Sequence, residues 1–258
     1  MPAIARLGQF FENPGTVSLE EALLRFASMR PSVDVDIAAE LQRLDRWASE
    51  IDGASIEELC DLMYRRLGFD GDREDYYRSE NSYLDSVLAR RRGVPITLAV
   101  VFLALARRAS IEVRAIGMPG HFMLLDYQSD RFIDPFNGGR FCQRSSLEAM
   151  LRTRGFDVPV SQYLTEVSDQ VIATRVVRNL VASLDQRPQG RLDWLLSACA
   201  VLPSAFFDPQ QLTLLAERSG HYGQVADYLD SIAQRIPATD LKRKVMLHRA
   251  QRLRAKLN

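Results

Sequence analysis

Cysteine and histidine are scarce in this sequence, and their scarcity excludes several kinds of chemistry. The three cysteines, Cys60, Cys142 and Cys199, are odd in number and far apart. This spacing argues against a disulfide framework and favours a reducing compartment, so we expect a cytoplasmic protein. No CxxC or HExxH spacing occurs, and three histidines are few for a zinc site. We therefore expect no metal and no cofactor.

The sequence also lacks an excess of charge and a long hydrophobic run. Lys and Arg together number 33, and Asp and Glu together number 33. Proteins that bind nucleic acids usually carry a basic excess because phosphate contacts supply most of their affinity, so no nucleic-acid partner is expected. The longest apolar-rich run, Val94–Ala106, is too short to span a bilayer and is typical of a buried helix. The first residues lack the charged start and apolar stretch of a secretory signal, and no membrane association is expected.

The first part of the chain, residues 1–70, has the pattern of a helical region. Two stretches, "SLEE" from Ser18 and "SIEE" from Ser55, have the spacing of a capping box, in which the serine and the glutamate cap a helix start reciprocally. Between them, apolar residues from Ile37 to Ile51 recur at helical spacing. Gly68 is a plausible helix stop.

The middle of the chain, residues 71–165, predicts helix and sheet together. A short helix capped by Ser82 precedes a helix over residues 95–109 that is apolar nearly all round and must therefore be buried on every side. Three strand candidates follow, over residues 111–117, 121–125 and 131–134, and "SSLEAMLR" predicts one more capped helix. The expected fold class is α+β and mostly helical, with a buried helix on a small antiparallel sheet.

The last part, residues 166–258, is helical again and carries a faint repeat. Pro203 and Pro237 lie 34 residues apart, as do Ala182 and Ala216. This is the spacing of a tetratricopeptide repeat, although an ordinary helical bundle with coincidental spacing is the alternative. Such repeats present a concave surface to peptides, so we expect a protein or peptide partner to bind here. The basic stretch "KRKVMLHRAQRLRAK" is read as a solvated terminal helix.

His121 and Asp134 are the candidate chemical residues. Each lies at the edge of a predicted strand, with a turn between them, so adjacent antiparallel strands would bring the two side chains together. A carboxylate that accepts from one imidazole nitrogen fixes the tautomer and leaves the other nitrogen free as a base. The alternative is a structural histidine that hydrogen-bonds within the core.

The segment around these residues resembles the transglutaminase-like core of the papain-like cysteine enzymes. The usual pattern of that core has a Gly-x-Cys at a helix start, an apolar helix, a "GIPAR"-like turn, a His and a "DP". The counterparts here are Gly93, the apolar helix, "SIEVR" from Ser110, His121, and Asp134 with Pro135. The resemblance implies the fold of that core.

Three longer motifs resemble a narrower group, the SirB-type bacterial family. These are "NSYLDSVLARRRGVPITL", "GMPGHFML" and "FIDPFNGG". Members of that family carry a helical N-terminal part and a tetratricopeptide-like tail, so the resemblance covers nearly the whole chain. It implies a fold and brings no biochemical activity with it.

The sequence departs from the enzymatic pattern at the nucleophile. The cysteine position falls on Pro95, which has no thiol, hydroxyl or N–H and can neither attack an amide carbon nor donate to an oxyanion. Thr97 lies about 200° further round the helix and suits the free N–H groups of the helix start better. Cys142 is more typical of a small buried hydrophobe.

Further residues are weaker candidates for the rim of a binding cleft at the helix start. They are Asn81, Tyr83, Arg92, Thr97 and Asn137. Packing is the alternative role for Tyr83, and a solvated face is the alternative for the arginine.

The sequence thus predicts a non-catalytic protein-interaction or regulatory protein built on a transglutaminase-like core. The alternative is an amide-directed hydrolase or transferase that uses His121 and Asp134 with an unconventional nucleophile or an activated water. A His121 whose free nitrogen lines a pocket near a hydroxyl or thiol would favour this enzyme. A buried and mutually satisfied pair, with no cavity at Pro95, would favour the binding role.

Overall fold

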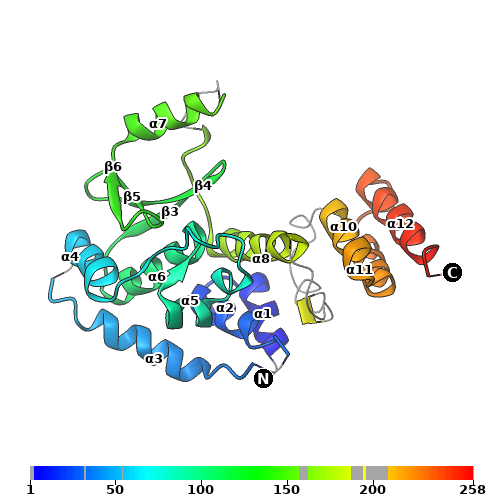
Figure 1. The fold of residues 1–258 in the computed structure, drawn as a ribbon, viewed down its shortest axis with the longest axis horizontal. Helices are drawn as coiled ribbons and strands as arrows, with labels where there is room; N and C mark the ends of the chain where they lie inside the picture. Colours follow the sequence, from blue (N-terminus) through cyan, green and yellow to red (C-terminus); the bar gives the residue numbers. More distant parts are fainter. Residues whose placement is uncertain are drawn as a thin grey trace. The chain divides into compact units, whose positions relative to one another are not determined.

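The computed structural model describes residues 3–31, 33–53, 55–156, 162–186, 194–195 and 209–257 (Figure 1). It divides into two compact units. One comprises residues 1–18, 25–35 and 177–258, and the other comprises residues 19–24 and 36–176. None of the helices in the described ranges is long and apolar enough to cross a membrane.

The N-terminal region is helical, as the sequence predicts. Its helices are α1 (Ala3–Glu12), α2 (Leu19–Ala27), α3 (Ile37–Ala48) and α4 (Ile56–Cys60), and α4 continues into a π-helical turn, η1 (Asp61–Arg66). Ser55 caps α4 by accepting from the backbone N–H of Glu58. The Glu58 carboxylate accepts from the N–H groups of Asp52 and Gly53, so only half of the predicted capping box forms. Gly68 follows with a φ of +74°, which suits a helix stop.

The short helix before the core begins later than predicted. A 3-10 turn, η2 (Ser79–Asn81), precedes α5 (Leu84–Arg90), and Tyr83 occupies the N-cap position of α5 without a hydrogen bond from its side chain. The predicted cap at Ser82 is wrong because Ser82 ends the 3-10 turn with φ −104° and ψ −8°, whereas an N-cap residue has an extended backbone, as Tyr83 has with φ −96° and ψ 120°.

The core helix α6 (Pro95–Arg108) confirms the prediction of a helix buried on all sides. Every residue from Pro95 to Ala106 is buried. Proline suits the first helical position because an N–H there would have no partner within the helix. Two short strands, β1 (Asp70–Gly71) and β2 (Arg92–Gly93), pair in parallel directly before α6.

A five-stranded antiparallel sheet supplies the β part, in the order β6-β5-β4-β3-β7. Its strands are β3 (Val113–Met118), β4 (His121–Asp126), β5 (Arg131–Asp134), β6 (Arg140–Cys142) and β7 (Thr165–Glu166). Helix α7 (Arg144–Thr153) packs Leu147 and Leu151 against Met123 and Phe132 on one face. No side chain caps α7 at Gln143, so the predicted capping serine is wrong. The fold class is therefore α+β, as expected.

The C-terminal helices are α8 (Asp169–Gln186), α10 (Pro209–Ser219), α11 (Tyr222–Gln234) and α12 (Leu241–Arg254). Leu212, Ala216, Leu229 and Ile232 of these helices are buried. Pro203 and Cys199 lie outside the described residues.

Candidate functional site

The structure brings His121 and Asp134 into hydrogen-bonding distance. Strands β4 and β5 pair Leu124 with Ile133, and continuing this register places Asp134 across from Met123, two residues from His121. Alternate residues of a strand share a face, so the two side chains are diagonal neighbours. His121 Nε2 lies 3.1 Å from Asp134 Oδ2, and the side chains are 14% and 12% exposed.

The loop after β5 surrounds the Asp134 carboxylate with donors. Oδ1 accepts from the backbone N–H groups of Phe136 (3.0 Å) and Asn137 (3.2 Å), and Oδ2 accepts from the Asn137 side-chain amide at 2.7 Å. Burial alone would raise the pKa of Asp134, but hydrogen bonds from His121 and Asn137 outweigh it and hold the pKa below its ordinary value. The carboxylate is therefore ionised at neutral pH.

An ionised carboxylate only accepts hydrogen bonds, so His121 donates through Nε2, and in the neutral form of the ring the lone pair is on Nδ1. No hydrogen bond to Nδ1 is formed by any residue that the structure describes. The pair therefore has the arrangement of a general base held by a carboxylate.

The start of α6 lies near this loop. Gly93 pairs with Gly71, and a Cβ added to Gly71 would lie 2.6 Å from the Phe136 ring. The β1 segment thus links the residues just before Pro95 to the loop that follows Asp134. Pro95 is buried and offers the site no nucleophile.

The hydroxyl of Thr97 is already used in the structure. Its oxygen accepts from the backbone N–H of Val94 at 3.1 Å and donates to the backbone carbonyl of Asn81 at 2.8 Å. The residue is 1% exposed. Thr97 therefore stabilises the helix start, as the sequence favours.

The two cysteines that the structure describes are poor nucleophiles. Burial raises the pKa of the Cys60 thiol to about 12. Burial also raises the pKa of Cys142, and the negative charge of Asp134 raises it further. Because the thiolate is the reactive form, neither thiol is activated at neutral pH.

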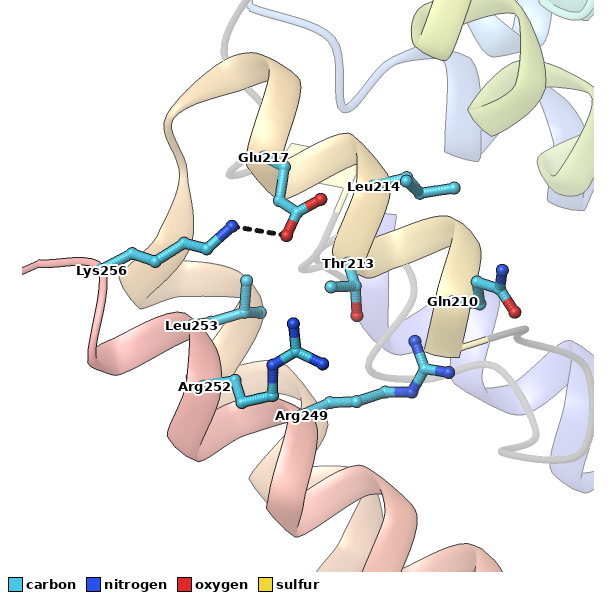
Figure 2. Close-up of a pocket in the computed structure, with 8 residues that line it drawn as sticks. All are labelled: Gln210, Thr213, Leu214, Glu217, Arg249, Arg252, Leu253 and Lys256. Carbon is cyan, nitrogen blue, oxygen red and sulfur yellow. Dashed lines mark hydrogen bonds and ion pairs between the residues drawn. The ribbon is translucent and has the colours of Figure 1, made fainter.

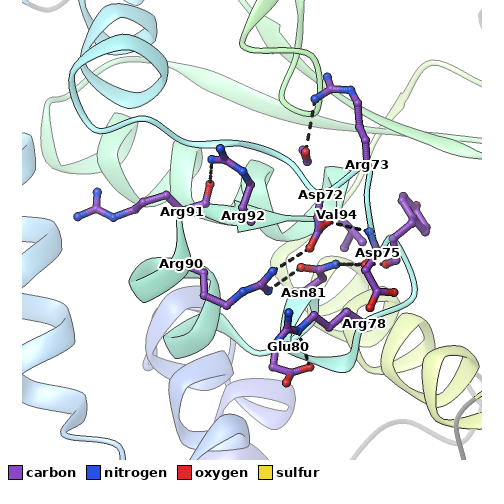
Figure 3. A network of polar contacts seen from close by, with 12 residues as sticks. Asp72, Arg73, Asp75, Arg78, Glu80, Asn81, Arg90, Arg91, Arg92 and Val94 are labelled. Carbon is purple, nitrogen blue, oxygen red and sulfur yellow. Dashed lines mark hydrogen bonds and ion pairs between the residues drawn. The ribbon is translucent and has the colours of Figure 1, made fainter.

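Asn81 belongs to a buried polar network (Figure 3). Its amide nitrogen donates to the carbonyl of Asp75 at 2.8 Å, and its amide oxygen accepts from Arg90 at 2.9 Å. Arg90 also donates to the Asp72 carboxylate at 2.8 Å. Asn81 is fully buried, so it fixes the loop between β1 and α5 and offers no side chain to a surface cleft.

The other rim candidates differ in their contacts. Tyr83 is buried, and exposed Arg92 donates to the carbonyls of Gly68 and Arg91. Asn137 is bonded to Asp134, and its amide oxygen accepts from Arg73 at 2.9 Å. Among the predicted rim residues, and within the described chain, only Asn137 forms a hydrogen bond to the His121–Asp134 pair.

Sequence reasoning missed two residues beside the pair. Arg73 reaches Asn137 and lies 5.1 Å from the centre of the Phe136 ring. Tyr64 has a buried hydroxyl for which the described residues supply no hydrogen-bond partner, and its ring lies where a Cβ on Gly139 would be. The pair of glycines in "FNGG" was the available signal, since a close approach there requires Gly139.

No group of three or more His, Cys, Asp or Glu side chains that could hold a metal ion is found within the described ranges.

The comparison with protein families agrees with this architecture. Residues 33–178 match the model of the transglutaminase-like superfamily. The match covers more than half of the 258-residue chain, and the chain therefore belongs to this superfamily.

Its curated relatives are bacterial and eukaryotic proteins. A UPF0162 protein of Xylella fastidiosa strain Temecula1 is 33% identical over 206 residues, which is 75% of this chain and 72% of that protein. A UPF0162 protein of strain 9a5c is 37% identical over 151 residues, which is 56% of this chain and 52% of that protein. Human F-box only protein 21 is 29% identical over 184 residues, and the match covers 66% of this chain and 28% of that protein. No solved structure matches the chain.

Proposed function

We propose that this chain is a non-catalytic protein-interaction or regulatory protein built on a transglutaminase-like core. The observation that carries the proposal is that neither the start of α6 nor the two described cysteines supply an activated nucleophile. Pro95 stands at the start of α6, the Thr97 hydroxyl is bonded to Asn81 and Val94, and the pKa values of Cys60 and Cys142 are raised. Acyl transfer through a covalent intermediate requires a thiol or hydroxyl that is free and activated.

The retained polar pair has a role in this proposal that needs no catalysis. Asp134 organises the backbone of its loop through Phe136 and Asn137, and Asn137 fixes Arg73. The hydrogen bonds to Asp134 therefore fix the conformation of the loop after β5, and His121 donates one of them.

Exposed aromatic side chains lie on the same surface. Tyr76 and Tyr77 are 42% and 48% exposed, and the Tyr76 ring contacts the Phe136 ring at 5.9 Å between centroids. Tyrosine and arginine are the residue types enriched in interface hot spots. We propose that a protein partner binds this surface, the C-terminal helices, or both. The SirB-type assignment, the repeat-like character of residues 166–258 and a cytoplasmic location belong to the same proposal.

Comparative capture from the lysate of the native host tests the proposal. Full-length wild type is compared with Tyr76→Ala/Tyr77→Ala and with His121→Asn, and bound proteins are quantified by mass spectrometry. We expect wild type to capture partner proteins without modifying them chemically. The tyrosine variant should capture smaller amounts of the same partners. Equal capture by all three proteins would remove the aromatic surface from the proposal, and absence of any reproducible partner would contradict it.

The alternative, an amide-directed hydrolase or acyl transferase, is supported by a different observation. Nε2 of His121 is hydrogen-bonded to an ionised carboxylate, and no described residue forms a hydrogen bond to Nδ1, which is the arrangement of a general base. Such an enzyme would use this base to activate a water or an unconventional nucleophile. Release of ammonia from glutamine-containing peptides tests it. Turnover by wild type that is lost in His121→Asn would establish the enzyme and overturn the non-catalytic proposal.

A further inference from the structure

A basic groove lies between α10 and α12 in the C-terminal helices (Figure 2). A cavity of about 240 Å³ is lined by Gln210, Thr213, Leu214 and Glu217 of α10, by Arg249, Arg252 and Leu253 of α12, and by Lys256 just beyond it. A second hollow of about 350 Å³ is lined by Lys244, Val245, His248, Arg249 and Arg252. Arg249 and Arg252 line both, so the two hollows form one continuous surface along α12.

Several cations of this groove form no close ion pair in the described chain, although the Glu217 carboxylate in the same lining attracts Arg252. Lys244, Arg249 and Arg252 make no ion pair with any described residue. In contrast, Arg254 on the same helix pairs with Asp227 and Asp230, at 2.7 and 2.6 Å. In Figure 2 the guanidinium groups of Arg249 and Arg252 extend from α12 toward α10. The chain as a whole has no net charge, so this local excess of positive charge is a property of the groove.

The spacing of the cations along α12 suits an elongated partner. Arg249, Arg252 and Lys256 are three and four residues apart, which places them on one face of α12 and its extension. At a rise of 1.5 Å per residue, Lys244 and Lys256 are about 18 Å apart along the axis. The Glu217–Lys256 ion pair, at 2.6 Å, stands at one end of the groove.

Apolar side chains lie beside the cations. Leu214, 39% exposed, lines the cavity between α10 and α12, and Val245, 41% exposed, lines the adjoining hollow along α12. A ligand that contacts both the cations and the apolar side chains must carry carboxylates for the arginines and apolar groups for Leu214 and Val245. An amphipathic acidic helix carries both at helical spacing. A nucleic-acid backbone matches the charges alone.

We infer that the groove between α10 and α12 binds an acidic, amphipathic helical segment of a protein partner. The inference rests on the proposed interaction function and names the chemistry of the partner at the C-terminal helices. Carboxylates of the segment bind Arg249 and Arg252 by charge-assisted hydrogen bonds, and its apolar side chains contact Leu214 and Val245.

Fluorescence anisotropy with a designed peptide tests this inference. The probe is a labelled peptide of about 20 residues, which spans ~30 Å as a helix, with Glu along one face and Leu beside it. Full-length wild type is compared with Arg249→Gln/Arg252→Gln. We expect the double variant to bind the peptide at least about 10-fold more weakly, because charge-assisted hydrogen bonds are lost. A peptide with Gln in place of every Glu should bind as weakly as the double variant binds the probe.

Arg254→Gln is the matched control, because it removes one charge from the same helix outside the groove. It should leave the affinity for the probe unchanged, and circular dichroism checks that each variant is folded. No binding by wild type, or equal binding by the double variant, would overturn the inference. So would a duplex DNA or an anionic vesicle that binds more tightly than the peptide with the same dependence on Arg249 and Arg252. If the peptide-binding test fails but partners are still captured through Tyr76 and Tyr77, the inference about the groove is wrong and the proposed function is unaffected.

Discussion

The hydroxyl of Thr97 and the backbone carbonyl of Asn81 are joined by a buried hydrogen bond of 2.8 Å. The same hydroxyl accepts from the N–H of Val94, so it connects the start of α6 to the loop before α5. The hydroxyl nearest in sequence to Pro95 therefore has a structural task. In this core the helix start is stabilised by a side chain at the third helical position, while the first position carries a proline.

Replacing Thr97 with Val should destabilise the protein by about 2 kcal/mol, because it leaves the Val94 N–H and the Asn81 carbonyl buried without their partner. Thr97→Ser keeps the hydroxyl and should cost less than half as much. Urea unfolding followed by circular dichroism measures both. Equal stability of the two variants would show that the hydroxyl contributes nothing at the helix start.

Gly139→Ala should be far more destabilising than Gly138→Ala. Both glycines have positive φ, of +70° and +64°, so each substitution carries the strain of a left-handed backbone, about 1 kcal/mol. At Gly139 the new Cβ would also lie 2.3 Å from the Tyr64 ring, whereas nothing lies within 4 Å at Gly138. We expect a further loss of about 2 kcal/mol for Gly139→Ala, measured by urea unfolding. Similar losses would mean that Tyr64 does not pack there.

Asp134 should make stability depend on pH in the acid range. Because its pKa is held below the ordinary value of 3.8, its ionised form is favoured by folding. Its contribution is therefore fully present above pH 3.8 and is lost as the pH falls through the lower folded value. Asp134→Asn should cost about 2 kcal/mol at neutral pH, and the gap from wild type should narrow in acid.

Unfolding free energies of the two proteins, measured by urea titration across this range, check the sign. The matched control is Asp36→Asn, an exposed carboxylate at the cap of α3. If the difference in unfolding free energy between wild type and Asp134→Asn increases on acidification, Asp134 is not hydrogen-bonded and ionised in the folded protein.

Cys60 and Cys142 should alkylate slowly in the folded protein. Their raised pKa values leave little thiolate at neutral pH, and the thiolate is the reactive species. Iodoacetamide labelling with site-resolved mass spectrometry should give rates at least about 10-fold below those in urea, where both thiols have an ordinary pKa near 8.5. Labelling of either cysteine as fast in the folded state would identify an activated thiol and favour the enzyme.

The sequence predicts the core well because its strongest signals are local. A helix apolar on every side can only be buried, and α6 runs from Pro95 to Arg108 where the pattern placed it. The turn between two short strands brought His121 and Asp134 together as expected.

The features that the sequence missed depend on contacts made at long range. Strands β1 and β7 are two residues long and have no periodicity to detect. The bond from Arg73 to Asn137 joins residues far apart in the chain. Ser82 has the residue type of a helix cap, but it ends a 3-10 turn with helical backbone angles, so α5 begins at Leu84. Capping propensity alone does not show that a preceding turn already fixes the backbone of the residue.

Restoring the missing thiol tests the central claim most directly. In Pro95→Cys, the rate of iodoacetamide alkylation at residue 95 is measured against pH and compared with Pro95→Cys/His121→Asn. If the core is a transglutaminase-like site that carries a proline at its nucleophile position, the new thiol should label several-fold faster below pH ~8.5 when His121 is present. Identical profiles in the two backgrounds would mean that position 95 does not face the His121–Asp134 pair, and would contradict the account.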